Sequence, residues 1–288
     1  MGRVLAVDVG GTKLAAALVD DTGAIEARSS APTPPGGDAD DLLGALLAVV
    51  RELDHDDVLA CGVGSGGPMR GHGELVSPLN IGGWRDFPLR AALAEAIRVP
   101  VVVDNDAKAL ALGEGWRGAG RGRPTFLAMV VSTGVGGGLV LDGRLLEGDD
   151  GNAGHIGHVI VEPDGRACAC GARGCLEAEA SGTAIAAVTG RPAADASPAV
   201  VARAGTLVGR AVASVCSLLD LHVVAVAGSV ALGFGAPFFD AANAELAARS
   251  RLAFATGARI VPAGLGADGP LVGAAALAWR SLGHEVLA

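Results

Sequence analysis

Residues 4–23 read VLAVDVGGTKLAAALVDDTG, two apolar runs joined by a glycine-rich turn and followed by an Asp-Thr-Gly turn. Short apolar runs bounded by Gly and Asp are typical of buried strands. Residues 126–143 repeat the pattern as FLAMVVSTGVGGGLVLDG, again a strand, a turn of Gly and Thr, a strand and an Asp-Gly turn. The chain is therefore predicted to have two similar halves with a ligand-binding cleft between them, where two-domain enzymes usually bind their ligands.

Strand and helix patterns alternate between these two stretches. Leucines recur at helical spacing in residues 42–50, residues 58–63 and 101–103 are apolar runs, and residues 107–116 have a helical pattern. Alternation of this kind predicts an α/β fold. The length of 288 residues favours two domains, and we place the boundary between the halves in the glycine- and arginine-rich residues 118–124.

The composition excludes several classes of protein. The chain has 22 Lys and Arg against 31 Asp and Glu, a formal charge of −9, whereas nucleic-acid binding needs clustered basic residues. The longest apolar stretch, residues 211–239, is interrupted by Asp220, His222 and Pro237. No run of consecutive apolar residues reaches the length of about 18 that a membrane helix needs, and no charged and then apolar leader opens the chain. We expect a soluble, cytoplasmic protein that binds neither nucleic acid nor membrane.

Both glycine turns suit an anionic ligand. Glycines let the backbone approach an anion and direct N–H groups toward it, and residues 8–13 read DVGGTK, which adds a carboxylate, a hydroxyl and an ammonium group. The spacing is not that of a Walker loop, and either turn alone could be an ordinary tight hairpin. Two such turns facing each other across a cleft, at residues 10–13 and 133–138, predict a site for a nucleoside triphosphate.

Asp106 has two interpretations that its local sequence leaves open. It follows the strand of residues 101–103 and precedes a helix, so it could be the N-cap of that helix, a role worth about 1 kcal/mol. An acid at the carboxyl end of a strand in an α/β fold also lies where substrates bind. There it could accept a proton from an attacking hydroxyl group.

Three of the five cysteines cluster with a histidine. Cys61 and Cys216 lie in apolar surroundings and are predicted to be core residues. In a cytoplasmic protein, clustering favours a metal over a disulfide, and three thiolates with one imidazole form a closed ligand set typical of structural zinc. The predicted ligands are His158, Cys168, Cys170 and Cys175.

A zinc ion there would hold the two flanking segments rigidly. A rigid loop presents its side chains to a ligand without having to be ordered at each binding event. His155, before the cluster, and Glu177, after it, are therefore candidates for contacting a polar substrate. The alternatives are a surface histidine and a solvated acid at the start of a helix.

Together these motifs resemble the ROK sugar kinases (repressor, open reading frame, kinase) over nearly the whole chain. The resemblance implies an actin-like, ribonuclease H-like ATPase fold: an N-terminal lobe of residues 1–118, a C-terminal lobe of residues 119–270, and a C-terminal helix in residues 271–288 that packs back on the first lobe. The motifs that carry it are Asp8-Val-Gly-Gly-Thr-Lys13, Asn105-Asp106-Ala107, Thr133-Gly-Val-Gly-Gly-Gly138, Gly154-x-x-Gly157-His158 and Cys168-x-Cys-Gly-x-x-Gly-Cys-x-Glu177.

The resemblance also implies roles for individual residues. The activity would be ATP-dependent phosphorylation of a sugar 6-hydroxyl, with Asp106 as the general base and a homodimer as the assembly. The residues that would hold the sugar are Gly66, Gly67, Asn105, Asp106, His155, His158 and Glu177. The residues that would hold ATP, with Mg²⁺ bridging its phosphates, are Asp8, Gly10, Gly11, Thr12, Lys13, Thr133, Gly134, Gly136 and Gly228.

Two positions depart from the family pattern. Many members have Asn where this chain has Lys108, and we expect that side chain to face away from the chemistry. Glucose-specific members usually have Glu where this chain has His155. A neutral imidazole offers one donor and one acceptor, which suits the N–H and carbonyl of an N-acetyl group.

The histidine, and residues 227–230, resemble bacterial N-acetylmannosamine kinases, which gives our first choice of substrate. Residues 80–85, NIGGWR, resemble the corresponding loop of actinobacterial glucokinases, so glucokinase is the alternative. Some family members are instead sugar-responsive repressors with a DNA-binding segment ahead of the kinase-like part. With Asp8 already at position eight, we expect no such segment.

Overall fold

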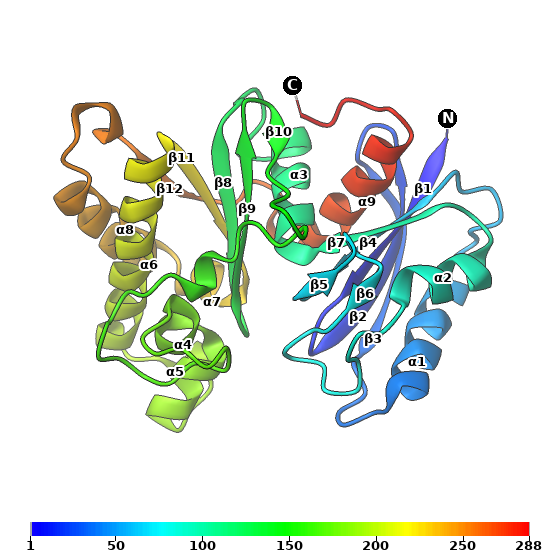
Figure 1. Cartoon of the computed structure of the whole chain (residues 1–288), viewed down its shortest axis with the longest axis horizontal. Coiled ribbons are helices and arrows are strands. Elements are labelled where there is room, and N and C mark those ends of the chain that lie inside the picture. Colours follow the sequence, from blue (N-terminus) through cyan, green and yellow to red (C-terminus); the bar gives the residue numbers. More distant parts are fainter. Residues whose placement is uncertain (1, 288) are drawn as a thin grey trace.

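The computed structural model describes residues 2–287, which form two lobes side by side (Figure 1). Each lobe is built on a five-stranded sheet, in the order β3-β2-β1-β4-β7 in the N-lobe and β10-β9-β8-β11-β12 in the C-lobe. In each sheet the first three strands are antiparallel neighbours, and the other two follow in parallel. The shared order confirms the prediction of duplicated halves.

The sheets consist of short, mostly buried strands. In the N-lobe these are β1 (Arg3–Val9), β2 (Lys13–Asp20), β3 (Ile25–Pro32), β4 (Cys61–Ser65) and β7 (Val101–Asn105). In the C-lobe they are β8 (Phe126–Val131), β9 (Val135–Leu141), β10 (Arg144–Leu145), β11 (Val223–Ala227) and β12 (Arg259–Pro262). A small hairpin of β5 (Met69–Arg70) and β6 (Leu75–Val76) extends from the N-lobe (Figure 1).

Helices cover both sheets. The N-lobe has α1 (Ala39–Arg51), α2 (Leu89–Ile97) and α3 (Asp106–Arg117). The C-lobe has α4 (Leu176–Ala180), α5 (Gly182–Thr189), α6 (Pro198–Leu219), α7 (Ser229–Phe234) and α8 (Ala236–Arg249), and α9 (Gly269–Ser281) is the last helix along the chain.

The second glycine turn is shorter than its sequence predicts. Strand β9 begins at Val135, so the turn is confined to residues 132–134 and the glycines of residues 136–138 lie within the strand. A Cβ atom on Gly138 would lie 2.6 Å from the backbone oxygen of Ala107 and 2.7 Å from Cα of Lys108. The glycines therefore let α3 cross β9 at close range, a packing role that the local sequence does not reveal. The apolar run at residues 58–63 also differs, since β4 begins only at Cys61.

Two helices lie between the sheets. Helix α9 packs against β1 and β4 of the N-lobe, whereas α3 packs against β8 and β9 of the C-lobe, and the two helices pack against each other. Gly62 in β4 lies so close to α9 that a Cβ atom would collide with the backbone oxygen of Ala274. The lobe boundaries at residues 118 and 270 stay a prediction.

A buried carboxylate joins the two segments that cross between the lobes. Glu114 of α3 has no solvent exposure. Its Oε2 accepts hydrogen bonds from the backbone N–H of Ala119 (2.7 Å), in the segment leading to β8, and of Gly264 (2.9 Å), in the segment leading to α9. Oε1 accepts from the N–H of Leu265 at 3.0 Å. One side chain thus satisfies three backbone donors at the junction of the lobes.

Replacing Glu114 by alanine is expected to lower the free energy of unfolding by about 3 kcal/mol, because three backbone donors lose their buried acceptor. Urea unfolding followed by circular dichroism measures the change. Glu95→Ala, at an exposed position of α2, is the control and is expected to stay within about 0.5 kcal/mol of wild type. A similar small change for Glu114→Ala would show that the carboxylate does not hold the junction.

Among the described residues, α6 is the one helix long and apolar enough to cross a membrane. More than half of its most apolar window, 56%, is buried inside the protein, and the helix packs against α8 and α4. Its two arginines pair with acids of the C-lobe, Arg203 with Glu179 and Arg210 with Glu162. These contacts are typical of a core helix, and we interpret α6 as the central helix of the C-lobe.

Candidate active site

Asp106 lies at the carboxyl end of β7, where α3 begins. Asn105 is the N-cap of α3, because its Oδ1 accepts a hydrogen bond from the N–H of Ala107 at 3.0 Å. Asp106 is the first helical residue, and its Oδ1 accepts from the same N–H at 2.8 Å. Of the two interpretations of Asp106, the N-cap role therefore belongs to its neighbour. The carboxylate of Asp106 is left at the end of the strand, the edge at which α/β folds bind substrates.

The environment of Asp106 favours its protonated form. Burial is the largest cause that raises the pKa of this carboxyl group, and the negative charge of Glu177 raises it further. The N–H bonds at the start of α3 act in the opposite direction. A carboxylate with a raised pKa is a better proton acceptor than an exposed one, as general-base catalysis requires.

A second carboxylate, Asp8, shares this region. It lies near the end of β1, next to the first glycine turn, and pairs across the sheet with Gly64 of β4. Burial raises the pKa of Asp8 to about 7, the charge of Asp106 adds to the rise, and Lys13 opposes it. Two partly buried carboxylates that repel each other in this way form a site that a divalent cation would stabilise.

Replacing Asp8 by asparagine is expected to stabilise the protein without ligands at high pH. An acid whose pKa is raised to about 7 on folding makes the folded state lose stability as the pH rises from about 4 to 7. The variant has no carboxyl group at this position and does not lose this stability. Near pH 4, where the loss in wild type has hardly begun, the two proteins should unfold at about the same denaturant concentration. At pH 8 the variant should be more stable by about 4 kcal/mol, since the pKa of Asp8 rises from 3.8 to about 7 and one pKa unit corresponds to about 1.4 kcal/mol. Urea titrations at the two pH values measure this difference. If wild type and Asp8→Asn were equally stable at pH 8, the raised pKa of Asp8 would be contradicted.

The structure brings Gly67, Asn105 and His155 together. A Cβ atom on Gly67 would lie 3.3 Å from Nδ2 of Asn105 and 3.4 Å from Cε1 of His155. These residues come from the end of β4, the end of β7 and a loop of the C-lobe, so three segments distant in sequence meet here. The meeting point adjoins Asp106, which follows Asn105 directly.

Asn80 is a site residue that sequence reasoning did not single out. A Cβ atom on Gly11 would lie 2.7 Å from Nδ2 of Asn80, and one on Gly66 would lie 3.3 Å from its Oδ1. The amide therefore stands between the first glycine turn and the segment that leads to Gly67. Asn80 opens the string NIGGWR, and nothing in that string indicates contact with either glycine.

His155 is neutral near pH 7. Burial lowers the pKa of His155 below its usual value of 6.5, and the proximity of His158 lowers it further. The two rings lie with centroids 6.0 Å apart. A neutral ring in this position offers one hydrogen-bond donor and one acceptor.

Glu177 links the zinc-ligand segment to the second glycine turn. Its Oε2 accepts a hydrogen bond from the N–H of Val135 at 2.8 Å. A Cβ atom on Gly134 would lie 2.7 Å from the same oxygen. Glu177 also lies close enough to Asp106 for its charge to influence that pKa. It is thus placed between the turn and the carboxylate, and its contact with a sugar stays a prediction.

The second turn is held from two sides. The oxygen of Ser132 accepts from the N–H of Gly182, the first residue of α5, at 2.7 Å. The Oγ of Ser132 lies 2.9 Å from Oγ of Ser229, at the start of α7. Gly228, just before α7, has a φ of +101° and stands so close to Val131 that a Cβ atom would collide with its backbone oxygen. Gly228 therefore lies beside Val131, two residues before Thr133, and its place in a nucleotide site with Thr133 and Gly134 stays a prediction.

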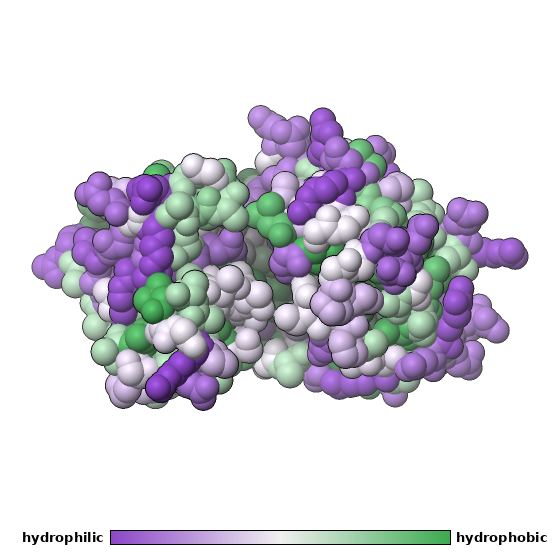
Figure 2. All heavy atoms as spheres, turned by 90° about the horizontal axis from the view of Figure 1, so that it is seen from below, coloured by the Kyte–Doolittle hydropathy of each residue, from purple (hydrophilic) through white to green (hydrophobic). Residues whose placement is uncertain are grey.

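The first turn occupies the equivalent position in the N-lobe. The N–H of Gly10 donates to the oxygen of Lys13 at 3.0 Å, closing the turn. The hydroxyl group of Thr33 donates to the oxygen of Gly10 at 2.7 Å. The side chains of Thr12 and Lys13 are exposed, so they are free to contact a ligand. Seen from below, the molecule is hollowed between the two lobes (Figure 2).

The four predicted zinc ligands form one cluster. Their donor atoms all lie within 4.8 Å of one another. Cys170 Sγ and Cys175 Sγ are 3.7 Å apart, and Cys168 Sγ is 3.7 Å from His158 Nδ1. With Zn–S bonds of about 2.3 Å, thiolates on a tetrahedron lie about 3.8 Å apart. The donor set and its spacing therefore fit zinc.

The cluster joins the segments that flank the site. His158 ends a short 3₁₀ helix, Ile156–His158, that follows His155. Cys175 is the N-cap of α4, whose second residue is Glu177. An ion bound by these four residues would fix His155 and Glu177 relative to each other.

Comparisons with known proteins agree with this architecture. A model of the ROK family matches residues 4–281. An N-acetylmannosamine kinase of Yersinia pseudotuberculosis is 39% identical over 254 residues, covering 82% of this chain and 86% of that protein. A ROK glucokinase of Streptomyces griseus, solved with glucose and AMPPNP, is 31% identical with a TM-score of 0.86, covering 97% of this chain and 100% of that one.

A ROK hexokinase from Thermus thermophilus is 34% identical with a TM-score of 0.77, covering 98% of this chain and 99% of that one. The likeness confirms the predicted fold class, a two-lobed actin-like ATPase fold. Since the family model spans nearly the whole chain and the duplicated sheets match, this chain belongs to the ROK family.

Proposed function

We propose that this chain is an ATP-dependent sugar kinase that phosphorylates the 6-hydroxyl of N-acetylmannosamine. The observation that carries the proposal is the convergence of a partly buried carboxylate, Asp106, with Asn105, Gly67 and His155 at one end of β7. The first glycine turn adjoins this point through Asn80. The relative from Yersinia pseudotuberculosis supports the choice of sugar.

The residues support a simple reaction path. The sugar would lie between Gly67, Asn105 and His155, with its 6-hydroxyl donating a hydrogen bond to Asp106. As the hydroxyl oxygen bonds to the γ-phosphorus of ATP, the bond from that phosphorus to the β,γ-bridging oxygen breaks. ADP leaves, and Asp106 takes the proton. Phosphoryl transfer of this kind depends on positioning and charge neutralisation more than on covalent chemistry by the protein.

The two glycine turns would hold the phosphates through backbone N–H groups. Mg²⁺, when bound, neutralises charge on the β- and γ-phosphates. Asp8 is the residue that would hold it, because its carboxylate lies beside the first glycine turn and its pKa is raised in the absence of a cation. Closure of the lobes around both substrates would exclude water, which otherwise competes as the acceptor.

His155 is the residue that we propose selects the sugar. An N-acetyl group at C2 presents one acceptor and one donor, and the neutral imidazole matches both. Glucose presents only hydroxyl groups, for which a glutamate is the better partner. The second candidate function is nevertheless glucokinase, favoured by the structural match to the Streptomyces griseus enzyme.

The zinc ion would be structural, because four protein ligands leave no open coordination position. His158 would bind it through Nδ1, the ring nitrogen nearest Cys168, and Nε2 would remain for the sugar.

The proposal also includes a cytoplasmic location, a homodimeric assembly and no binding to nucleic acid or membrane. The location and the homodimer rest on the family, and the expectation of no nucleic-acid binding rests on the net charge of −9.

The test is a coupled ADP-release assay with N-acetylmannosamine, N-acetylglucosamine, glucose, mannose, fructose and allose. We expect the highest kcat/KM with N-acetylmannosamine. His155→Glu is expected to move the preference ratio toward glucose by about tenfold, the effect of one mismatched hydrogen bond to a charged group. An unchanged ratio would remove the role given to His155, and a higher kcat/KM of wild type for glucose would favour the alternative.

A further inference from the structure

The loop that carries His155 belongs to the C-lobe chain but is bonded to the N-lobe. This loop, residues 146–155, follows β10. Asn152 at its tip makes two hydrogen bonds to one residue of β5: its Oδ1 accepts from the N–H of Met69 at 3.0 Å, and its Nδ2 donates to the oxygen of Met69 at 2.9 Å. Met69 is two residues after Gly67. The loop is therefore tied to the segment that lines the proposed sugar site.

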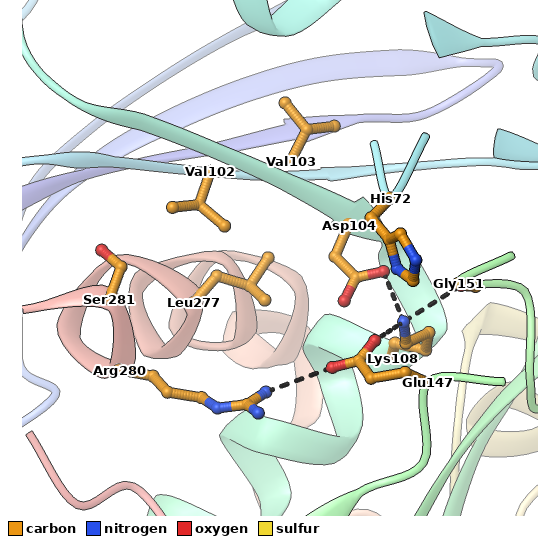
Figure 3. Close-up of a pocket in the computed structure, with 10 residues that line it drawn as sticks. All are labelled: His72, Val102, Val103, Asp104, Lys108, Glu147, Gly151, Leu277, Arg280 and Ser281. Carbon is orange, nitrogen blue, oxygen red and sulfur yellow. Dashed lines mark hydrogen bonds and ion pairs between the residues drawn. The ribbon is translucent and has the colours of Figure 1, made fainter. Parts of the chain in front are cut away.

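Lys108 makes a second connection between the loop and the N-lobe (Figure 3). It lies on α3, two residues after Asp106, and only 1% of it is exposed. Its Nζ forms an ion pair with Asp104 at 2.9 Å and another with Glu147 of the loop. The same atom donates to the backbone oxygen of Gly151 at 3.1 Å. The side chain thus bonds the loop to the β7–α3 junction that supplies Asn105 and Asp106.

The contacts of the loop with its own lobe lie at its two ends. At the first end, the N–H of Leu146 donates to the oxygen of Leu139 in β9 at 2.8 Å. At the second end, a Cβ atom on Gly154 would collide with the backbone oxygen of Gly137 in β9. Near its tip the loop has bonds within itself, such as that from the N–H of Ala153 to the oxygen of Glu147 at 3.0 Å. The loop therefore spans the two lobes, with its tip on the N-lobe and its ends on the C-lobe.

We propose that Asn152 and Lys108 are positioning residues that hold His155 against Gly67 and Asn105 before the sugar binds. The subsite for the C2 substituent of a 2-acylamino sugar is then assembled on the N-lobe, although His155 comes from the C-lobe chain. The proposal rests on the proposed sugar kinase function and adds to it the residues that order the subsite. It also gives Lys108 a role: its ammonium group faces the loop that carries His155.

The physical reason is preorganisation. A loop that is ordered in advance does not lose conformational freedom when the ligand binds, so affinity rises without a new contact to the ligand. Lys108 contributes here because its side chain is 1% exposed, whereas Arg280, whose guanidinium lies 3.5 Å from Glu147, is 43% exposed. Exposed pairs of that kind contribute little.

The experiment compares Asn152→Ala with a matched control. Asn152→Ala removes both bonds to Met69, and the KM for the sugar is expected to rise about tenfold or more. The KM for ATP and kcat at saturating sugar should change less than threefold, because neither the turns nor Asp106 are touched. The control is Asn243→Ala. Asn243 makes the same pair of bonds to Ile260, both at 2.9 Å, within the C-lobe, and its loss should leave the KM for the sugar unchanged.

Hydrogen–deuterium exchange on the protein without ligands provides a readout that does not need activity. Asn152→Ala should increase exchange in residues 146–155 and leave β8 and β9 as in wild type. Asn152→Asp keeps the acceptor but loses the donor to Met69, so it should give an intermediate increase. Unchanged exchange in the loop, or an unchanged KM for the sugar in an active enzyme, would overturn the proposal. Increased exchange in a protein that phosphorylates no sugar would instead overturn the proposed function, while the anchoring of the loop would stand.

Discussion

Asp106→Asn is expected to abolish turnover while sugar binding survives. Asparagine keeps the shape of the side chain but cannot accept the proton of the 6-hydroxyl. General-base catalysis typically contributes about 10²–10⁴-fold to the rate, and we expect a loss in kcat within that range. The coupled ADP-release assay measures kcat, and isothermal titration calorimetry measures the Kd for the sugar, which should change less than threefold.

The matched control is Asp40→Asn. Asp40 lies in the first turn of α1, as Asp106 does in α3, but it is exposed. Its replacement should leave kcat as in wild type. If Asp106→Asn retained kcat within tenfold of wild type, the carboxylate would not be the base. If the variant lost sugar binding as well, Asp106 would be needed to bind the sugar, and the loss of turnover would not identify it as the base.

Cys170→Ser is expected to lose the metal and, with it, affinity for the sugar. The wild-type protein should contain about one zinc ion per chain, and the variant almost none, because a structural site with three remaining ligands is open to water. Without the ion, the segments that present His155 and Glu177 are no longer fixed to each other. The KM for the sugar should rise by about tenfold or more, because these segments must then lose conformational freedom when the sugar binds.

Elemental analysis and sugar titration measure the two effects. Cys216→Ala is the control, because Cys216 is a buried cysteine of α6 outside the cluster, and this variant should keep its zinc. Cys170 is the exposed member of the cluster, so its replacement disturbs packing least. A wild-type protein that contains no zinc and is fully active would contradict the account.

Much of the site was predictable because its chemistry is local in sequence. The cysteine cluster spans few residues, so clustering in the sequence indicated ligands whose donor atoms do lie within 4.8 Å of one another. The two glycine turns were predictable because a strand, a turn and a strand follow each other directly. Asp106 was recognisable as the residue after a strand, and its neighbour Asn105 proved to be the helix cap.

The remaining features depend on partners far away in the chain, which periodicity and spacing do not reveal. Glu114 looks like one more polar residue of a helix, yet its carboxylate binds backbone groups 150 and 151 positions away. Asn152 meets Met69 across 83 residues. The glycines of β9 were read as a phosphate turn, whereas Gly138 serves the close crossing of α3. In each case the packing of the two lobes, rather than the local sequence, decides the role.

The most direct test of the central claim is the identity of the product. Purified protein is incubated with Mg-ATP and N-acetylmannosamine, and the product is analysed by two-dimensional ¹H–³¹P NMR spectroscopy. We expect one new phosphate ester whose phosphorus couples to the two methylene protons at C6, formed in equal amount to ADP. Release of ADP without any sugar phosphate, or an ester on a different carbon, would contradict the assignment of Asp106 as the base for the 6-hydroxyl.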